Sequence, residues 1–407
     1  MNKIDSTIIN NIYDNLIDKD DYCYVYDLNE ISNSINNIVK YMPNNFSLYY
    51  AMKANSNYQI LDYIKSNKGI SGFEIASSGE LEKALKYCNN KEIIYTGPGK
   101  TEKELELAIA QNIRLINVES VIEAIRINKI AEKLNIDKID ILLRINMDYK
   151  IVEAAENMGG LSTKMGIDEK QYLENYNHIK NLKHINILGI HVFSASGILN
   201  YKAGIDYAKY VFDMVKELEQ QGQQIKIIDL GGGLGVDYSG NEKRFDTKNY
   251  FIELQDLINN YNYSNKEFIL ELGCYLVASC GYYISKIIDI KNSKDYKHIV
   301  LAGGLNHIPT ATLNGRHPFY IINMNEEKIY EKQISVKNEV VDIDGPLCTA
   351  EDKVLWDVYV EKAEIGDFVV IRQAGAYCYS AAWLEFLSHK YPFEILLNKK
   401  NKLEICN

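Results

Sequence analysis

The sequence lacks the patterns that mark several common classes of protein. Its seven cysteines form no CxxC pair, and its seven histidines form no HExxH motif. Neither a disulfide scaffold nor a metal site is therefore expected, and a reducing cytoplasm is the predicted location.

Long apolar runs and an excess of basic residues are also absent. No run approaches the roughly 20 apolar residues that a membrane-spanning helix needs, and the start, MNKIDSTIINNIYDN, carries no apolar signal core. Acidic residues outnumber basic ones by 55 to 45, so the formal net charge is −10. This balance disfavours a nucleic-acid binder and a polybasic membrane contact.

What the sequence does have is a regular alternation over its first two thirds. Short β-branched or aromatic runs precede helix-like segments such as TEKELELAIAQN, with apolar residues three and four apart. Eight such units favour an α/β fold, a (β/α)8 barrel, over an open doubly wound sheet. The expected strands are Phe46–Met52, Ile70–Ile75, Glu92–Thr96, Ile113–Val118, Ile139–Ile145, Ile187–Val192, Ile225–Leu230 and Phe268–Glu271.

Beyond residue 275 the pattern changes to short β-branched segments bounded by Gly, Asp or Asn. Only one helix is expected there, near Ala381–Leu387. The chain of 407 residues is long enough for two domains. We predict a barrel over residues 31–274 and an all-β domain over residues 275–407, which residues 1–30 complete.

A barrel carries its chemistry at the C-terminal ends of its strands. These ends are rich in ionisable residues and glycine: Lys53, Glu74, Gly97, Glu119, Arg144, His191, Gly231–Gly233 and Glu271. The three glycines follow the seventh strand, where barrels often bind phosphate. Consecutive glycines let backbone N–H groups approach an anion, although a tight turn is the alternative.

Three side chains on this rim suggest one cofactor. Lys53 could form a Schiff base, or it could be a surface lysine with a buried stem. Glu271 could hold a cationic ring nitrogen or pair with a basic residue, and His191 could stack on a flat ring or be a core histidine. Together with the phosphate loop they indicate pyridoxal phosphate (PLP) chemistry.

The whole chain resembles the fold-type III PLP-dependent decarboxylases, the group of ornithine, arginine and diaminopimelate decarboxylases. The matching blocks are YYAMKAN, GFEIASSGEL, IIYTGPGK, HVFSASG, IDLGGGLGV, LELGCYLV, GPLCTAED and AGAYCYSAAWLEFLSH. GPLCT and the GAYxYS…FLSH ending are similar to the subgroup that serves siderophore and acyl-carrier pathways. The resemblance implies an alanine racemase-like fold and a homodimer with shared active sites. It also implies that the strand YCYVYDL joins the C-terminal β domain.

The resemblance further implies roles for individual residues. Lys53 resembles the Schiff-base lysine, His191 the ring-stacking imidazole and Glu271 the partner of the pyridine nitrogen. Cys348 resembles a cysteine that one subunit lends to its neighbour's site, where it or Lys53 returns a proton to Cα. The implied phosphate-binding set is Ser194, Gly232, Gly233, Gly273 and Tyr377.

One departure from the family concerns phosphate. The family usually has Glu-x-Gly-Arg at the eighth strand, but this chain reads Glu271-Leu272-Gly273-Cys274. The arginine is therefore absent, and Arg144 and Arg316 are the candidates to replace it.

A second departure concerns the substrate. The residue after the family cysteine is often Asp or Glu, placed to bind a distal ammonium, but here it is the neutral Thr349. An amino acid whose distal amine is acylated fits better, with citryl-ornithine or citryl-diaminopropionate of carboxylate siderophore biosynthesis expected first. Arg316, His307 and His317 are the candidates to meet the citrate carboxylates.

Several alternatives stay open. The chain could decarboxylate diaminopimelate, ornithine, lysine or a glutamyl group on an acyl-carrier protein. A racemase on the same barrel would carry arginine at the ring nitrogen, where this chain has Glu271. A catalytically dead homologue gains slight support from Cys274, but the retained Lys53, His191 and Cys348 argue against it.

Overall fold

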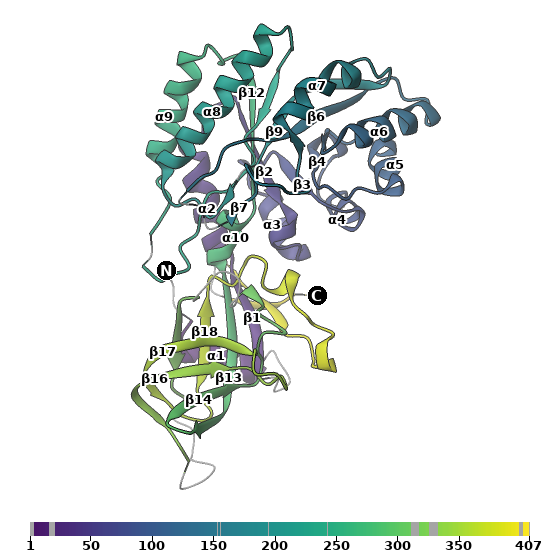
Figure 1. The fold of residues 1–407 in the computed structure, drawn as a ribbon. Helices are drawn as coiled ribbons and strands as arrows, with labels where there is room; N and C mark the ends of the chain where they lie inside the picture. Colours follow the sequence, from purple (N-terminus) through teal and green to yellow (C-terminus); the bar gives the residue numbers. More distant parts are fainter. Residues whose placement is uncertain are drawn as a thin grey trace. The chain divides into compact units, whose positions relative to one another are not determined.

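The structure, a computed structural model, describes residues 4–15, 21–152, 154, 156–193, 195–241, 243–310, 317–324, 333–398 and 402–406. They divide into two compact units (Figure 1). One unit spans residues 34–236 and 243–276, and the other spans residues 1–33, 237–242 and 277–407. Residues 237–242, which the sequence placed in the barrel, therefore group with the β-rich unit, and the two domain boundaries stay a prediction.

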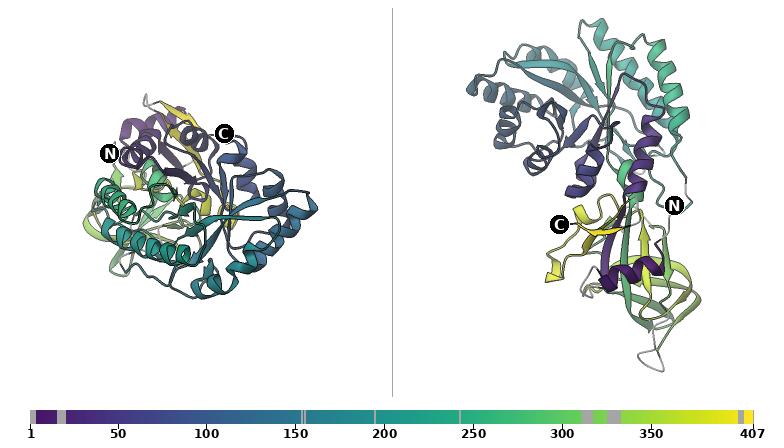
Figure 2. Two further views of the ribbon diagram at one scale, coloured as in Figure 1. Left: turned by 90° about the horizontal axis from the view of Figure 1, so that it is seen from above. Right: turned by 180° about the vertical axis from the view of Figure 1, so that it is seen from behind.

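The first unit is a closed barrel of eight parallel strands, which confirms the predicted (β/α)8 architecture (Figures 1 and 2). The ring closes because β5 pairs with β6 and β12 pairs with β2. Each strand lies at one of the eight predicted runs. In chain order they are β2 (Phe46–Ala51), β3 (Gly72–Ile75), β4 (Ile93–Tyr95), β5 (Leu115–Val118), β6 (Ile139–Asn146), β9 (Ile185–Val192), β11 (Ile227–Asp229) and β12 (Glu267–Leu272).

Helices surround the strands, and several begin at a capping side chain. The side chains of Ser77, Thr101 and Ser120 each accept a hydrogen bond from a backbone N–H in the first turn of the helix that follows. A cap of this kind contributes about 1 kcal/mol to helix stability. The helices that follow the barrel strands are α3 (Tyr58–Lys65), α4 (Ser78–Ala84), α5 (Glu102–Ala110), α6 (Val121–Lys133), α7 (Glu169–Lys180), α8 (Tyr201–Gln220), α9 (Thr247–Asn260) and α10 (Cys274–Val277).

The second unit is built on a twisted β-sheet. Its strands are β13 (Gly281–Ser293), β14 (Tyr296–Leu301), β15 (Phe319–Ile322), β16 (Val336–Asp344), β17 (Lys353–Ala363), β18 (Phe368–Arg372), β19 (Phe393–Leu397) and β20 (Leu403–Ile405). The N-terminal strand β1 (Tyr22–Asp27) pairs with β13 and with β19. The expectation that YCYVYDL joins this sheet is therefore confirmed.

The structure differs from the sequence prediction at two helices. The helix expected near Ala381–Leu387 is wrong: the segment contains only the short 3-10 turns η4 (Tyr379–Ala381) and η5 (Phe386–Ser388). Leu387 and its successor have φ values of 56° and 55°, which a right-handed helix does not allow. The short helix α1 (Ser6–Asn15) was not predicted, and its buried Ile9 and Ile12 join the core of the sheet.

In the described part of the chain, no helix combines the length and the apolar character that crossing a bilayer requires.

Candidate active site

A polar layer lies directly above an apolar layer in the barrel strands. The apolar layer consists of Tyr49, Ile94, Leu115, Leu142, Ile227 and Ile269. Side chains alternate between the two faces of a strand, so the residue two positions further on faces the same way. The corresponding positions toward the C-terminal strand ends hold Thr96, Asn117, Arg144, Asp229 and Glu271, all of them buried.

His191 joins this layer because β9 contains an irregularity. The register between β6 and β9 shifts at Ile141 and Leu142, where one extra residue of β9 is accommodated. His191 then lies opposite Arg144 on one side and Asp229 on the other. A bulge of this kind re-aims a side chain next to a site.

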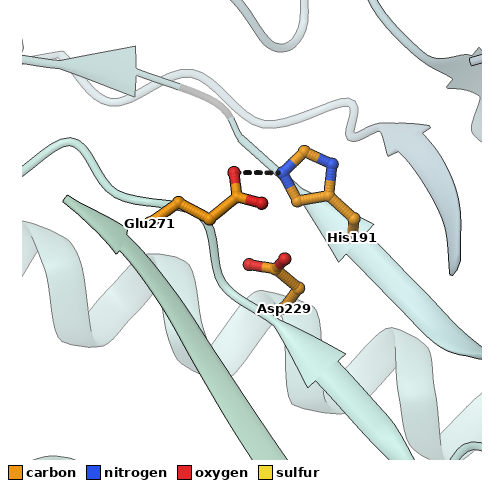
Figure 3. A group of neighbouring side chains, drawn as sticks. All are labelled: His191, Asp229 and Glu271. Carbon is orange, nitrogen blue, oxygen red and sulfur yellow. Dashed lines mark ion pairs between the residues drawn. The ribbon is translucent and has the colours of Figure 1, made fainter. Parts of the chain in front are cut away.

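His191, Asp229 and Glu271 point toward one another from neighbouring strands (Figure 3). Nε2 of His191 lies 3.4 Å from Oε2 of Glu271. Neither ring nitrogen of His191 has a hydrogen-bond partner among the described residues, although the ring is 0% exposed. Buried polar groups are normally hydrogen-bonded, so the missing partners, rather than exposure, mark His191 as a candidate for contact with a cofactor.

The three side chains of this group differ in their pKa values. Burial raises the pKa of Asp229 well above its usual value, and the charge of Glu271 adds to that rise. Burial also opposes the charge of Glu271, but the neighbouring His191 and Lys53 outweigh it and lower the pKa of Glu271 to about 2. Burial lowers the pKa of His191. Glu271 is therefore the anion of the group, and Asp229 is its neutral acid.

Lys53 lies in the turn η1 (Met52–Ala54), directly after β2. Its Nζ donates to both carboxylate oxygens of Glu74 at 3.2 and 3.1 Å. The lysine side chain is 44% exposed, whereas that of Glu74 is 1% exposed. Burial raises the pKa of Glu74 to about 7, although the charge of Lys53 opposes the rise. Lys53 thus combines an accessible amine with a buried proton acceptor.

The glycine loop after β11 has the backbone that the sequence predicted for an anion site. Gly231 and Gly233 have φ values of 65° and 93°, which favour glycine. A Cβ on Gly232 would fall 2.2 Å from the carbonyl oxygen of Glu271. The N–H of Gly231 donates to Oδ1 of Asp229 at 2.9 Å, which ties the loop to the polar layer.

These observations fit PLP. The arrangement supplies an exposed amine for an aldehyde, a buried anion for a cationic ring nitrogen, an imidazole face and a glycine loop for phosphate. His191, Asp229 and Glu271 also place ligand atoms within 4.8 Å of one another, a spacing that a metal ion could use. A metal alone would leave the lysine and the glycine loop without a role.

One of the candidate phosphate residues, Arg144, does not have the predicted surroundings. Arg144 is 3% exposed, and its guanidinium donates to Glu119 at 2.6 Å. Because Glu119 also accepts from the N–H groups of Gly97 and Gly166, Arg144 is part of a buried network. Ser194 and Arg316 lie outside the described residues.

The β-rich unit holds the remaining candidates. Cys348 and Thr349 are exposed in the loop between β16 and β17. Tyr377 has a φ of 59°. His307 and His317 are each 1% exposed, so their burial argues against direct contact with a substrate. His307 bonds to the hydroxyl of Tyr283 through Nδ1 at 3.0 Å, and His317 bonds to the hydroxyl of Thr310 through Nε2 at 3.2 Å.

The sequence reasoning missed four residues: Thr96, Asn117, Asp229 and Arg244. The first three could have been found by counting two residues beyond the inward apolar position of each strand. Arg244 follows the glycine loop and forms a backbone bridge with Val236. No motif marked it.

Comparison with known proteins gives a consistent result. A family model described as "Pyridoxal-dependent decarboxylase, pyridoxal binding domain" matches residues 28–278. A Staphylococcus aureus protein named 2-[(L-alanin-3-ylcarbamoyl)methyl]-2-hydroxybutanedioate decarboxylase is 32% identical over 94% of this chain and 95% of its own length. An L-glutamyl-[BtrI acyl-carrier protein] decarboxylase of Niallia circulans is 33% identical over 86% of this chain and 82% of its own.

A solved structure agrees with the sequence matches. The diaminopimelate decarboxylase of Helicobacter pylori, crystallised with L-lysine, superposes with a TM-score of 0.84 at 27% identity. The match covers 96% of this chain and 94% of that one.

Proposed function

This chain belongs to the pyridoxal-dependent decarboxylases and is a PLP-dependent amino-acid decarboxylase; we propose that its substrate is an amino acid whose distal amine is acylated. A citryl-diamino acid used in carboxylate siderophore biosynthesis is the proposed compound. The observation that carries this proposal is the match to the Staphylococcus aureus enzyme along nearly the full length of both chains. The name of that enzyme describes diaminopropionate whose distal nitrogen is amidated by citrate.

Residues of the barrel would hold the cofactor. Lys53 would bond its aldehyde, His191 would lie against the ring, and Glu271 would bind the ring nitrogen. Gly232, Gly233 and Gly273 would bind its phosphate, together with Ser194; Tyr377 of the β-rich unit is the remaining phosphate residue that the family resemblance implies. When bound, PLP withdraws electrons from the substrate Cα, which is what makes loss of the carboxylate feasible.

Arg244 is proposed to replace the family arginine, because this chain has Cys274 at that position. Its backbone bridges Val236 beside the glycine loop. Its positive charge opposes the burial that raises the pKa of Tyr275, the neighbour of Cys274. Arg244 is exposed, and no ion pair or hydrogen bond of its side chain occurs among the described residues. A guanidinium in this position suits a phosphate, which it can bind with two parallel hydrogen bonds.

Side chains must deliver the proton that the reaction consumes. Decarboxylation replaces a carboxylate on Cα with hydrogen, so each turnover delivers one proton to that carbon. Cys348 of a second subunit is the proposed donor, and Lys53 is the alternative. Glu74 can exchange a proton with the amine of Lys53, because the two groups are in contact and the carboxyl titrates near neutral pH.

The chemistry around Thr349 supports an acylated substrate. An ammonium at the distal end of a free diamino acid would require a carboxylate partner, whereas the side chain of Thr349 is neutral. Its hydroxyl accepts a hydrogen bond from the N–H of Glu351 at 3.3 Å, which orders the loop. A carrier-bound glutamyl group also lacks a free distal amine and is the second candidate, favoured by the Niallia circulans match.

The test is carbon dioxide release from a panel of substrates. The panel contains citryl-diaminopropionate, citryl-ornithine, carrier-bound glutamate, diaminopimelate, ornithine and lysine. We expect the highest kcat/KM with a citryl-diamino acid. A higher value with free diaminopimelate, ornithine or lysine would contradict the proposal while leaving the decarboxylase family intact.

A further inference from the structure

Two neutral side chains from the opposite side of the barrel contact Glu271. Nδ2 of Asn117 donates to Oε1 of Glu271 at 3.1 Å, and the hydroxyl of Thr96 donates to the same oxygen at 3.3 Å. Asn117 and Thr96 are also bonded to each other at 2.9 Å. In the sheet order, β3 and β2 lie between the strands of these residues and β12, so the contacts cross the barrel interior.

We infer that Thr96 and Asn117 are positioning residues that fix the Glu271 carboxylate through Oε1 and leave Oε2 for the ring nitrogen of the cofactor. This inference rests on the proposed role of Glu271. Oε2 is the oxygen that faces His191, the proposed ring-stacking residue, at 3.4 Å. One oxygen is therefore occupied by protein donors, and the other points to where the ring is expected.

The physical reason concerns both direction and charge. A buried glutamate can rotate about its side-chain bonds unless hydrogen bonds select one orientation. Donors that are neutral stabilise the anion without adding a positive charge that would compete with a cationic ring nitrogen. Thr96 and Asn117 are 5% and 0% exposed, so water does not supply the same bonds.

The surrounding strands hold the two donors in place. Lys100 donates from Nζ to the carbonyl oxygens of Gly97 and Asn117 at 2.7 and 2.8 Å, and to Glu123 at 2.7 Å. It therefore links the end of β4 to β5, the two strands that carry the donors. A shift of either strand would move the donors away from Glu271.

The experiment measures the protonation of the ring nitrogen directly. Holoenzyme is reconstituted with PLP that carries nitrogen-15 in the ring, and its chemical shift is followed against pH in the absence of substrate. In Thr96→Val and Asn117→Leu we expect the ring nitrogen to lose its proton about one pH unit lower than in wild type, with kcat about ten-fold lower. KM should change little, because the substrate does not contact these residues.

Matched variants separate this role from general destabilisation. Thr96→Ser keeps the hydroxyl and should keep the wild-type shift. Asn186→Leu removes a similar amide–carboxylate bond, to Asp140 at 2.6 Å near the start of β9, and should leave the ring nitrogen unchanged. If Asn117→Leu fails to fold, the inference is tested by comparing the ring-nitrogen shift of Thr96→Ser with that of Thr96→Val.

The inference is overturned if both Thr96→Val and Asn117→Leu fold and keep the wild-type nitrogen shift across the pH range. Because no substrate is present in this measurement, a wrong substrate assignment cannot produce that result. Failure of the substrate proposal would appear only in the carbon dioxide panel.

Discussion

At the scale of single residues, the active site follows from strand alternation. Five barrel strands carry an apolar side chain in the inner layer and a polar one two residues later, as Ile269 and Glu271 do. Lys53 does not follow this alternation, because it lies in the turn after its strand, where its side chain stays accessible. The chemistry therefore depends on residue identity at a few positions of an otherwise regular barrel.

Replacing Lys53 tests the covalent role of its amine. Lys53→Ala should lower kcat by at least about a thousand-fold, because it removes both the amine that binds the aldehyde and a nearby proton carrier. Borohydride should fix the cofactor to the wild-type chain but not to the variant, as read by peptide mass. Lys83→Ala, whose amine bonds to Ser56, is the matched control and should still be labelled.

Glu74 should make the cofactor-free protein less stable as the pH rises. Its pKa is about 7 in the folded chain and about 4.5 when exposed. A carboxyl that binds its proton more tightly when folded gives its full stabilisation below pH 4.5 and loses it through pH 7. Urea unfolding of apoenzyme between pH 5 and 8 should show this decline, and Glu74→Gln should flatten it. A decline of equal size in Glu74→Gln would assign it to other groups.

At the scale of elements, the sequence predicted the barrel better than it predicted the irregular segments. The run Phe46–Met52 is apolar at all but one position, as buried parallel strands are, so such a strand can be predicted from sequence alone. The positive φ of Leu387 prevents a continuous helix there, and an apolar pattern cannot reveal it. The bulge that aims His191 inward is equally invisible, yet His191 was found because it ends a strand.

The loop between β11 and α9 provides the next prediction. Arg244→Ala should weaken PLP binding about ten-fold, because it removes a charge-assisted contact to phosphate. Binding of pyridoxal, which has no phosphate, should not change. Cys274→Arg in the Arg244→Ala background should restore PLP affinity, since it returns the family arginine.

Lys243→Ala is the matched control for this loop. It removes a neighbouring positive charge without removing the guanidinium, so PLP affinity measured by fluorescence titration should fall less than two-fold. Equal losses for PLP and pyridoxal in Arg244→Ala would refute a phosphate contact.

At the scale of the whole molecule, the β-rich unit should lose stability in acid. Burial lowers the pKa of His307 and of His317 to about 4. A histidine that is neutral when folded stabilises fully above its usual pKa of 6.5 and loses that contribution as the pH falls toward 4. Acid can therefore lower the free energy of unfolding by up to about 3 kcal/mol for each of these histidines. Acid should therefore destabilise the β-rich unit, which holds both tryptophans, Trp356 and Trp383.

Tryptophan fluorescence during urea unfolding reads out this effect. Between pH 7 and 4.5 the midpoint should fall, and His317→Asn should reduce the fall, because the amide can bond to the carbonyl oxygen of Arg372 without taking up a proton. His178→Asn changes an exposed histidine of the barrel and should match wild type. An unchanged acid response in His317→Asn would locate the sensitivity elsewhere.

The proposed sharing of active sites between two subunits gives the last prediction, which concerns two chains rather than one. Cys348 is exposed in its loop, as a residue that serves a neighbouring subunit must be. Lys53→Ala and Cys348→Ala homodimers should each have very low activity. In a hybrid dimer of the two variants, one site would combine an intact Lys53 from one chain with an intact Cys348 from the other.

Random mixing makes about half of the dimers hybrid, so activity should return to about a quarter of wild type. If each site used only its own chain, both sites of every hybrid would lack one residue and activity would stay at the homodimer level. Differently tagged chains, purified through both tags, allow the hybrid to be measured by itself.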